Sequence, residues 1–150
     1  MKMNPQYKKA QENMMPGVIT AGGFLGDDER NIKTIITDDE EKMKFYSLDY
    51  PGVCSTLEYL LSEGENGLGE FITVDGRWLV RTLEARGHLP CPFEDGIHRK
   101  ITCEVINKKN NEKILFSSIS IHLLKEHHFH EGIGSDFRLE PETLKKVLMF

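Results

Sequence analysis

The stretch FITVDGRWLVRTL, residues 71–83, decides the fold class. Two runs of strand-forming residues, 71–74 and 77–83, flank the pair Asp75-Gly76. An Asp-Gly pair in that setting is typical of a two-residue β-hairpin turn, because both central residues take a positive φ there. Apolar side chains occur on both faces of the second strand and predict that helices cover much of the sheet. One face carries Trp78, Val80 and Thr82, and the other carries Leu79, Arg81 and Leu83.

A second hairpin is predicted further along the chain. Residues 101–106 alternate between two faces, residues 107–112 are polar, and residues 114–116 are apolar. This pattern predicts a third strand, a turn and a fourth strand. The two hairpins are expected to be joined by a long irregular connection over residues 85–100, because that segment holds two prolines and two glycines.

Helices are expected both before and after the strands in the sequence. Residues 16–26 form an apolar, glycine-rich connector that lacks the lysine and hydroxyl pair of a phosphate-binding loop. Apolar residues at helical spacing follow over residues 32–36 and 53–61, and the second helix is expected to open at Pro51 and end at Gly64. After the strands, one helix is expected to end at Gly132 and another to begin at Pro141.

These elements predict one α+β domain over residues 1–150. An antiparallel sheet of about four strands, arranged as two hairpins, is expected to pack against N-terminal helices and two C-terminal helices. The expected order is a flexible polar tail over residues 1–15, a helical segment 16–64, β-hairpins 70–118 and C-terminal helices 119–150. A chain of this length buries about two thirds of the surface that its unfolded form exposes.

Composition narrows the class of protein. The formal net charge of -5 argues against a general affinity for nucleic acid or anionic membrane, so binding through Arg77, Arg81 and Arg99 ranks last among the hypotheses. No apolar run approaches the roughly 18 residues that a membrane span needs. Three cysteines without Cys-x-x-Cys spacing predict reduced thiols and a cytoplasmic protein.

Residues 121–130, IHLLKEHHFH, hold four of the six histidines. If a serine-capped helix continues through this stretch, His122, Glu126 and His130 recur every four residues and share one face. Two imidazoles and a carboxylate in that arrangement predict a site for a divalent metal such as zinc, with water at an open position. The alternative is that the imidazoles are solvated, stabilise the helix C-terminus, or pack beside Phe129.

The connection over residues 85–100 offers further candidates. Cys91 and His98 are expected as additional ligands if this segment meets the histidine-rich helix, because thiolate and imidazole are the ligands that zinc prefers. A nucleophilic Cys91 activated by His88 or His98 is a second interpretation of the same residues.

The segments LEARGHLPCPF, residues 83–93, and SIHLLKEHHFHEGIGSDFRLEPETL, residues 120–144, carry a resemblance. Over roughly residues 69–148 the chain resembles the C-terminal half of a group of small bacterial cytosolic proteins of unknown function. The resemblance implies an intracellular bacterial protein and assigns no catalytic residues. The pattern shared with that group consists of His122, Phe129, Gly132, Gly134, Ser135 and Arg138. His127, His128 and His130 do not all belong to it, which argues against a site of four histidines.

Two functions from different classes remain open, and no enzymatic activity is assigned. The first is a non-enzymatic binding or protein-interaction module, with a homodimer as the expected assembly, because no complete catalytic set is present and the strands carry apolar groups on both faces. The alternative is a metal-binding, zinc-type, hydrolase-like site built from the segment 122–130 and the loop 86–100.

Overall fold

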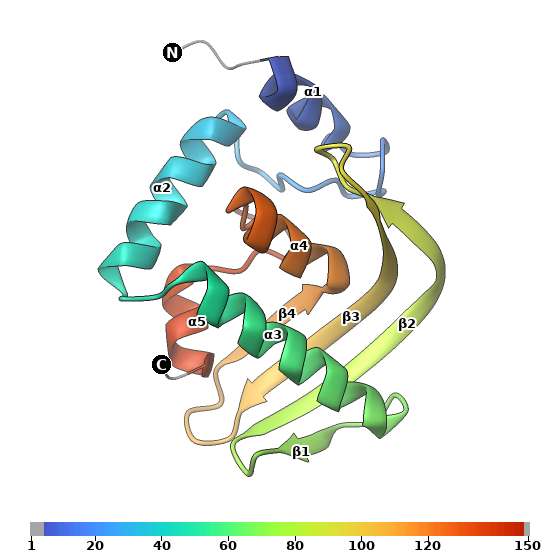
Figure 1. Ribbon diagram of the computed structural model, residues 1–150, viewed down its shortest axis with the longest axis vertical. Helices are drawn as coiled ribbons and strands as arrows, with labels where there is room; N and C mark the ends of the chain where they lie inside the picture. Colours follow the sequence, from blue (N-terminus) through green and yellow to red (C-terminus); the bar gives the residue numbers. More distant parts are fainter. Residues whose placement is uncertain (1–4, 149–150) are drawn as a thin grey trace.

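The computed structural model describes residues 5–148 and has the predicted α+β architecture (Figure 1). One antiparallel sheet of four strands, in the order β1-β2-β3-β4, is combined with N-terminal and C-terminal helices. In chain order the elements are α1 (Pro5–Asn13), α2 (Ile32–Phe45), α3 (Tyr50–Gly64), the short 3-10 helix η1 (Glu65–Gly67), β1 (Ile72–Val74), β2 (Trp78–Pro90), β3 (Ile97–Asn107), β4 (Lys113–Ser117), α4 (Ser118–His127) and α5 (Pro141–Leu148). Among the described helices, none has both the length and the apolar character to cross a bilayer.

The hairpin between β1 and β2 is as predicted. Asp75 and Gly76 take φ values of 55° and 67°, which the two-residue hairpin turn requires. The register pairs Val74 with Trp78 and Ile72 with Val80. The predicted hairpin between β3 and β4 is also present, and it begins its ladder with Ile106 opposite Lys113.

The predicted irregular connection over residues 85–100 is wrong, because most of it is strand. β2 continues to Pro90 and β3 begins at Ile97, so the two strands form one long antiparallel hairpin whose tip is Cys91–Gly96. The register shifts between Ala85 and His88, where Gly87 has a φ of 92°. Residues 83–88 are exposed on both faces, so the sequence there has no apolar alternation to mark it as a strand.

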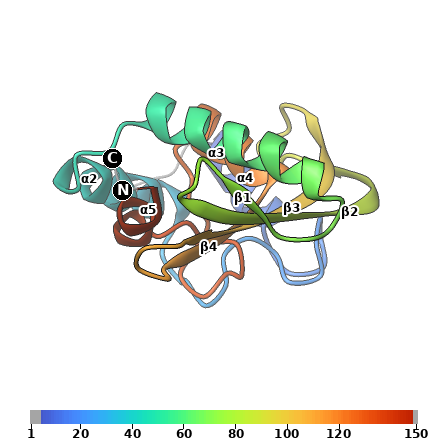
Figure 2. The same ribbon diagram turned by 90° about the horizontal axis from the view of Figure 1, so that it is seen from below.

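Helices cover one face of the sheet only. Figure 2 shows α3 and α4 on one side, while the loop segments near residues 16–31 and 128–140 lie on the other side. Trp78, Val80 and Thr82 of β2 are buried on the face that α3 covers, whereas Leu83 on the opposite face is 55% exposed. Helices therefore cover one face of the sheet, and loop segments lie on the other.

Two clusters of buried apolar side chains form the core. The first lies between the sheet and the helices α3, α4 and α5, and includes Leu57, Val80, Val105 and Leu144. The second joins α1, α2 and the opposite side of α4, and includes Met14, Ile35, Leu123, Phe129 and Cys91. The thiol of the hairpin tip therefore belongs to the core that the N-terminal helices share with α4.

The N-terminal segment is not the flexible tail predicted for residues 1–15. Residues 5–13 form α1, and Ala10 and Met14 are 1% and 0% exposed. Pro5 suits the first turn of a helix because its missing N–H has no partner there. The apolar residues are too few to mark an amphipathic helix in the sequence, and packing against α2 and the hairpin tip stabilises it instead. The remaining part of the predicted tail, residues 1–4, lies outside the described residues.

A buried ion pair joins the C-terminal segment to α2. Both terminal nitrogens of Arg138 lie 2.8 Å from the carboxylate oxygens of Asp39, whose side chain is fully buried. Arg138 also donates to the backbone carbonyl of Glu131. This bidentate pair fixes the chain between α4 and α5 against α2.

Candidate metal centre

Helix α4 ends earlier than predicted, at His127 and not near Gly132. Its N-terminus has the expected serine cap, in which Ser117 and Ser120 bond reciprocally to each other's backbone N–H. Its last helical residue is His127, because His128 takes the left-handed conformation with a φ of 52°. The backbone N–H of Phe129 then bonds to the carbonyl of Leu123 and closes the helix. The prediction that His122, Glu126 and His130 share one face of this helix is therefore wrong, because His130 lies beyond its end.

The tip of the β2–β3 hairpin folds back toward the C-terminal end of α4. The N–H of Cys91 bonds to the carbonyl of Gly96, and the N–H of Glu94 bonds to the carbonyl of Cys91, both at 2.8 Å. These bonds form a tight turn. The ring of Phe93 stacks on the imidazole of His127 with the centroids 3.9 Å apart. Asn13 of α1 donates to the carbonyl of Pro92, so helices on both sides hold the tip in place.

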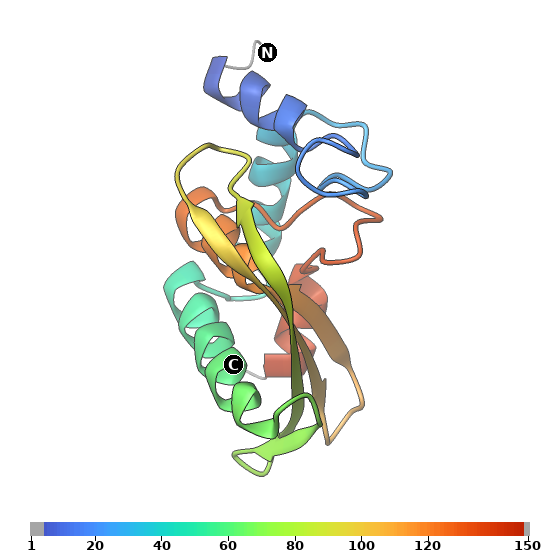
Figure 3. The same ribbon diagram turned by 90° about the vertical axis from the view of Figure 1, so that its right-hand side faces the viewer.

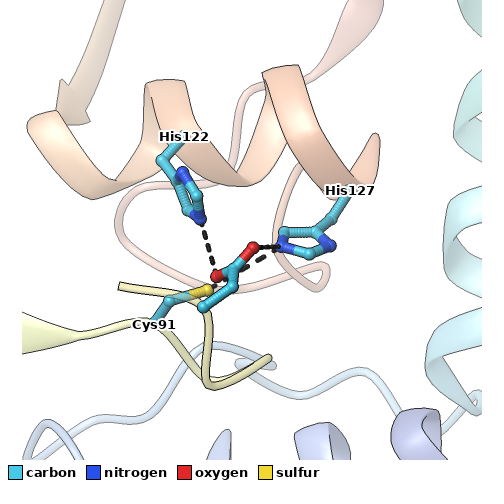
Figure 4. Close-up of side chains that lie close together, drawn as sticks. Cys91, His122 and His127 are labelled. Atoms are coloured by element: carbon cyan, nitrogen blue, oxygen red, sulfur yellow. Dashed lines mark hydrogen bonds and ion pairs between the residues drawn. The ribbon is translucent and has the colours of Figure 1, made fainter. Parts of the chain in front are cut away.

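Four potential metal ligands converge where this tip meets α4. Figure 4 shows Cys91 pointing from the hairpin toward His122 and His127 of the helix, and Asp95 completes the group. Nε2 of His122 lies 2.9 Å from Oδ1 of Asp95, and Nε2 of His127 lies 2.7 Å from Oδ2. Sγ of Cys91 is 3.9 Å from Nε2 of His127. All four ligand atoms lie within 4.8 Å of one another.

The spacing of these donors suits a tetrahedral ion. Bonds of 2.0–2.3 Å to zinc place the four ligand atoms about 3.3–3.8 Å apart in a regular tetrahedron. Thiolate, imidazole and carboxylate are all ligands that zinc accepts. Small side-chain rotations would bring the 3.9 Å and shorter contacts to this spacing, so Cys91, Asp95, His122 and His127 could hold one zinc-type ion.

The pKa values of Cys91 and Asp95 are shifted in opposite directions. Burial, reinforced by the hydrogen bond to Asp95, raises the pKa of the Cys91 thiol to about 12. Burial opposes ionisation of Asp95, but hydrogen bonds from Cys91, His122 and His127 outweigh it and hold the pKa of Asp95 below its ordinary value. In the absence of metal, a neutral thiol therefore lies beside a carboxylate. A metal ion would displace the thiol proton, as is usual for cysteine ligands.

The arrangement does not fit a cysteine nucleophile. In a nucleophile–histidine–acid relay the acid binds the ring nitrogen opposite the one that faces the nucleophile. Here the same atom, Nε2 of His127, faces both Asp95 and Cys91. Cys91 is also only 1% exposed, and the predicted activator His88 is exposed on β2. Convergence on a single point is the geometry of a ligand set.

His98 lies next to the cluster without belonging to it. Its ring centroid is 4.3 Å from that of His122, and its Nε2 atom is buried without a hydrogen-bond partner in the part of the chain that the structure describes. Burial, and then the neighbouring His122, lower the pKa of His98. His98 therefore lies beside the group of four ligands and is not part of it, so its role as an additional ligand stays a prediction.

The other two predicted ligands lie elsewhere. Glu126 is exposed and is not one of the four converging ligands. His130 is 1% exposed, and its two ring nitrogens lie 3.0 Å from the hydroxyl of Tyr50 and 2.8 Å from the carbonyl of Leu139. Burial lowers the pKa of His130 to about 4. Both of its nitrogens are occupied, so it acts as a core histidine.

Sequence reasoning found Cys91 and His122 but missed Asp95 and His127. Residues five apart in a regular helix point about 140° away from each other, so the spacing of His122 and His127 argues against a shared site. They meet the same carboxylate only because the hairpin tip lies at the end of α4, where the helix closes. The sequence signal for Asp95 would have been its position four residues after Cys91 in a hairpin tip, which was not recognised as one.

Comparison of the chain with protein-family models, with curated proteins and with solved structures gives no match.

Proposed function

We propose that this chain is a non-enzymatic metal-binding module, in which one zinc-type ion joins the tip of the β2–β3 hairpin to α4. The convergence of Cys91, Asp95, His122 and His127 within 4.8 Å is the observation that supports it. The two halves of the ligand set come from segments about thirty residues apart, so the ion would close a loop between them in the way of a structural metal.

The number of donors favours a structural role over a hydrolytic one. Structural zinc sites are closed by four protein ligands, whereas catalytic sites keep one position for water or substrate. Four ligands occupy a tetrahedral ion completely. The surroundings also favour a fixed site, because the thiol is buried in the second core cluster and Phe93 stacks on His127.

Metal content and cobalt spectroscopy test the proposal. Protein purified without a histidine tag should contain close to one equivalent of zinc, or take it up after stripping. Cobalt in its place should give the intense visible bands of a tetrahedral ion and a near-ultraviolet band from the thiolate of Cys91. Cys91→Ser should remove the thiolate band, and His127→Ala should lower the affinity at least tenfold, as losing a ligand or its support typically does.

Matched variants separate the site from the rest of the chain. Cys54→Ala removes another buried thiol, and His88→Ala removes an exposed imidazole; both should bind metal as the native chain does. Less than about a tenth of an equivalent of any transition metal after incubation with excess would count against the proposal, because a formed set of four ligands should retain it. Equal affinity in native protein and His127→Ala would also contradict it.

A hydrolase-like centre is the second candidate, and one observation favours it. The side chain of Asp95 is 38% exposed, compared with 16% for His122 and 19% for His127. If water took the place of this carboxylate, the ion would keep three protein ligands and Asp95 would be positioned as a base. Zinc-dependent hydrolysis of an activated ester, abolished in Asp95→Ala, would support this candidate. Zinc binding without turnover would support the structural role.

Assembly and location follow as further parts of the proposal. The outer face of the sheet carries Leu83, Leu115 and Phe71 at 55%, 40% and 37% exposure, and a homodimer through this face would cover them. Light scattering on the eluting protein should then give twice the mass of the chain, and a monomer would remove the dimer. A reduced cytoplasmic setting agrees with three free thiols, one of them a proposed ligand.

A further inference from the structure

A second concave site lies on the face of the sheet opposite α3 and α4. It is a cavity of about 630 Å³ between the exposed end of the β2–β3 hairpin and two loop segments, residues 19–26 and 131–137. Figure 3 shows the loops near these residues together on one side of the sheet, with α3 and α4 on the other. The volume is within the range of small-molecule sites, about 300–1,000 Å³.

The loop side of the cavity is rigidly assembled. The N–H of Gly132 bonds to the carbonyl of Phe24, and the N–H of Asp27 bonds to the carbonyl of Ile133, both at 2.9 Å. A Cβ on Gly132 would collide with the carbonyl of Leu25, so the two backbones approach as closely as only glycine allows. Residues 16–26 were predicted to be a connector, and in the fold part of this connector lines the cavity.

One of the residues that line the cavity, Glu131, has a buried side chain. This residue is 3% exposed and has a φ of 73°. Oγ of Ser135 donates to its Oε1 at 2.7 Å, and the hydroxyl of Ser120 also bonds to the carboxylate. Burial raises the pKa of Glu131 to about 7, and nearby Asp136 acts in the same direction.

No cation in residues 5–148 forms an ion pair with this carboxyl group. Arg138 approaches it but donates to the backbone carbonyl of Glu131, and its charge is matched by Asp39. On the strand side, Lys100 and Arg99 also line the cavity, and Arg99 is held by a bidentate pair with Glu84 at 2.6 Å and 2.9 Å. Burial of the carboxyl group and the left-handed backbone of Glu131 each destabilise the folded state. Strained residues and perturbed acids of this kind cluster at functional sites.

We propose that this cavity binds a small molecule with an apolar body and a primary amine, whose ammonium group pairs with Glu131. The apolar body would lie against Ile19, Phe24, Leu89, Ile119 and Phe137, which line the cavity. An ammonium ion would form the ion pair that this carboxyl group does not make within residues 5–148, and it would donate to a carboxylate already oriented by two hydroxyls. A ligand carboxylate would meet Glu131 with the wrong charge.

The experiment compares probes that differ only in the polar group. Phenethylamine, phenethyl alcohol and hydrocinnamate share an aromatic ring and a short chain, and they are titrated into the full-length protein with NMR detection. The amine should bind about tenfold or more tightly than the alcohol, because a hydrogen bond to a charged partner is worth that much when desolvated. Amide signals of residues 19–24 and 131–135 should shift.

Two variants and one control locate the effect. Glu131→Gln should lose the preference for amine over alcohol. Ala85 is exposed and lines the cavity, so Ala85→Phe should block both ligands without changing Glu131. Repeating the titration of the native chain with a chelator present should leave the preference for amine over alcohol unchanged, which excludes coordination of the amine to metal.

Equal affinity for amine and alcohol in the native chain overturns the proposal, as does unchanged amine binding in Glu131→Gln. Absence of any shift at residues 131–135 overturns it too. If Glu131→Gln does not fold, the amine-to-alcohol ratio in the native chain and the response of Ala85→Phe still decide the matter.

Discussion

Strand β2 ends in two hairpin tips of very different kinds. At its N-terminal end, Asp75 and Gly76 make a two-residue turn, and the side chain of Asp75 accepts a hydrogen bond from the hydroxyl of Tyr59, at 2.7 Å. At its C-terminal end, the tip over residues 91–96 contacts α1 through Asn13 and α4 through His127. The first tip only reverses the chain. The second brings reactive side chains to a distant helix.

The difference shows how a hairpin tip acquires a function. A turn stabilised by its own backbone needs no further partner, so its side chains remain in solvent. The longer tip contains Glu94 at a φ of 63° and buries Cys91 completely, neither of which a free loop would maintain. These conformations persist because surrounding helices hold them, and the same packing positions the ligands.

The largest expected effect is stabilisation of one tip by metal. With free zinc at about a hundred times its dissociation constant, the free energy of unfolding should rise by about 2.7 kcal/mol, because zinc would bind the folded chain and not the unfolded one. Cys91→Ser should lose most of this gain, while Gly76→Ala at the other tip should retain all of it. Urea denaturation with zinc and with chelator measures the difference. An equal gain in Cys91→Ser would contradict the assignment of the thiol.

The aromatic contact at the second tip gives the next effect. Phe93 is partly buried against His127 and Phe129, so Phe93→Ala should lower the free energy of unfolding by about 1–2 kcal/mol, less than a full core deletion. Phe45 is 79% exposed and provides the matched control, with a change within about 0.5 kcal/mol. Denaturation in chelator separates packing from metal binding. Equal effects of the two substitutions would mean that the tip is not packed on α4.

The sequence predicts the first tip, at Asp75 and Gly76, but not the second, at residues 91–96. The Asp75-Gly76 turn is local, since its φ values follow from two adjacent residues and the alternating runs beside them. The extension of β2 to Pro90 has no such signal. Residues 83–88 have solvent on both faces, and the register shift at Gly87 interrupts any alternation that remains. Strand structure there follows from pairing with β3, which is a tertiary property.

Dependence on tertiary structure also explains why only part of the candidate metal centre was predicted from the sequence. Cys91 and His122 could be chosen by residue type, but which histidine joins them depends on where α4 closes. His128, a residue without the conformational freedom of glycine, ends the helix in place of the predicted Gly132. Because the helix ends earlier, His130 is buried in the core and His127 lies at the candidate metal centre. Asp95 reaches its partners through the turn of the tip, which no helical or strand period encodes.

A smaller effect is expected from the first tip. Gly76 has a φ of 67° with open space around its Cα, so Gly76→Ala meets backbone strain alone and should cost about 1 kcal/mol. Gly22 also has open space but no positive φ, and Gly22→Ala should leave stability unchanged or slightly increased. Thermal or urea unfolding of the two variants measures this. A neutral Gly76→Ala would mean that the turn does not need its left-handed conformation.

The smallest effect is a pH dependence at Asp95 in the metal-free protein. Because the pKa of Asp95 in the folded state lies below its ordinary value of 3.8, the carboxylate stabilises the folded state above pH 3.8, and this stability is lost as the pH falls through the folded-state pKa. The difference in unfolding free energy between the native chain and Asp95→Asn should therefore be constant near neutrality and shrink under acid conditions. It should be small, since the side chain is 38% exposed and solvent screens its contacts. Urea denaturation in chelator across this pH range, with Asp75→Asn as the baseline for the other tip, makes the measurement. A difference that grows on acidification would mean that Asp95 is not a carboxylate receiving hydrogen bonds from Cys91, His122 and His127, and the ligand geometry built on it would fail.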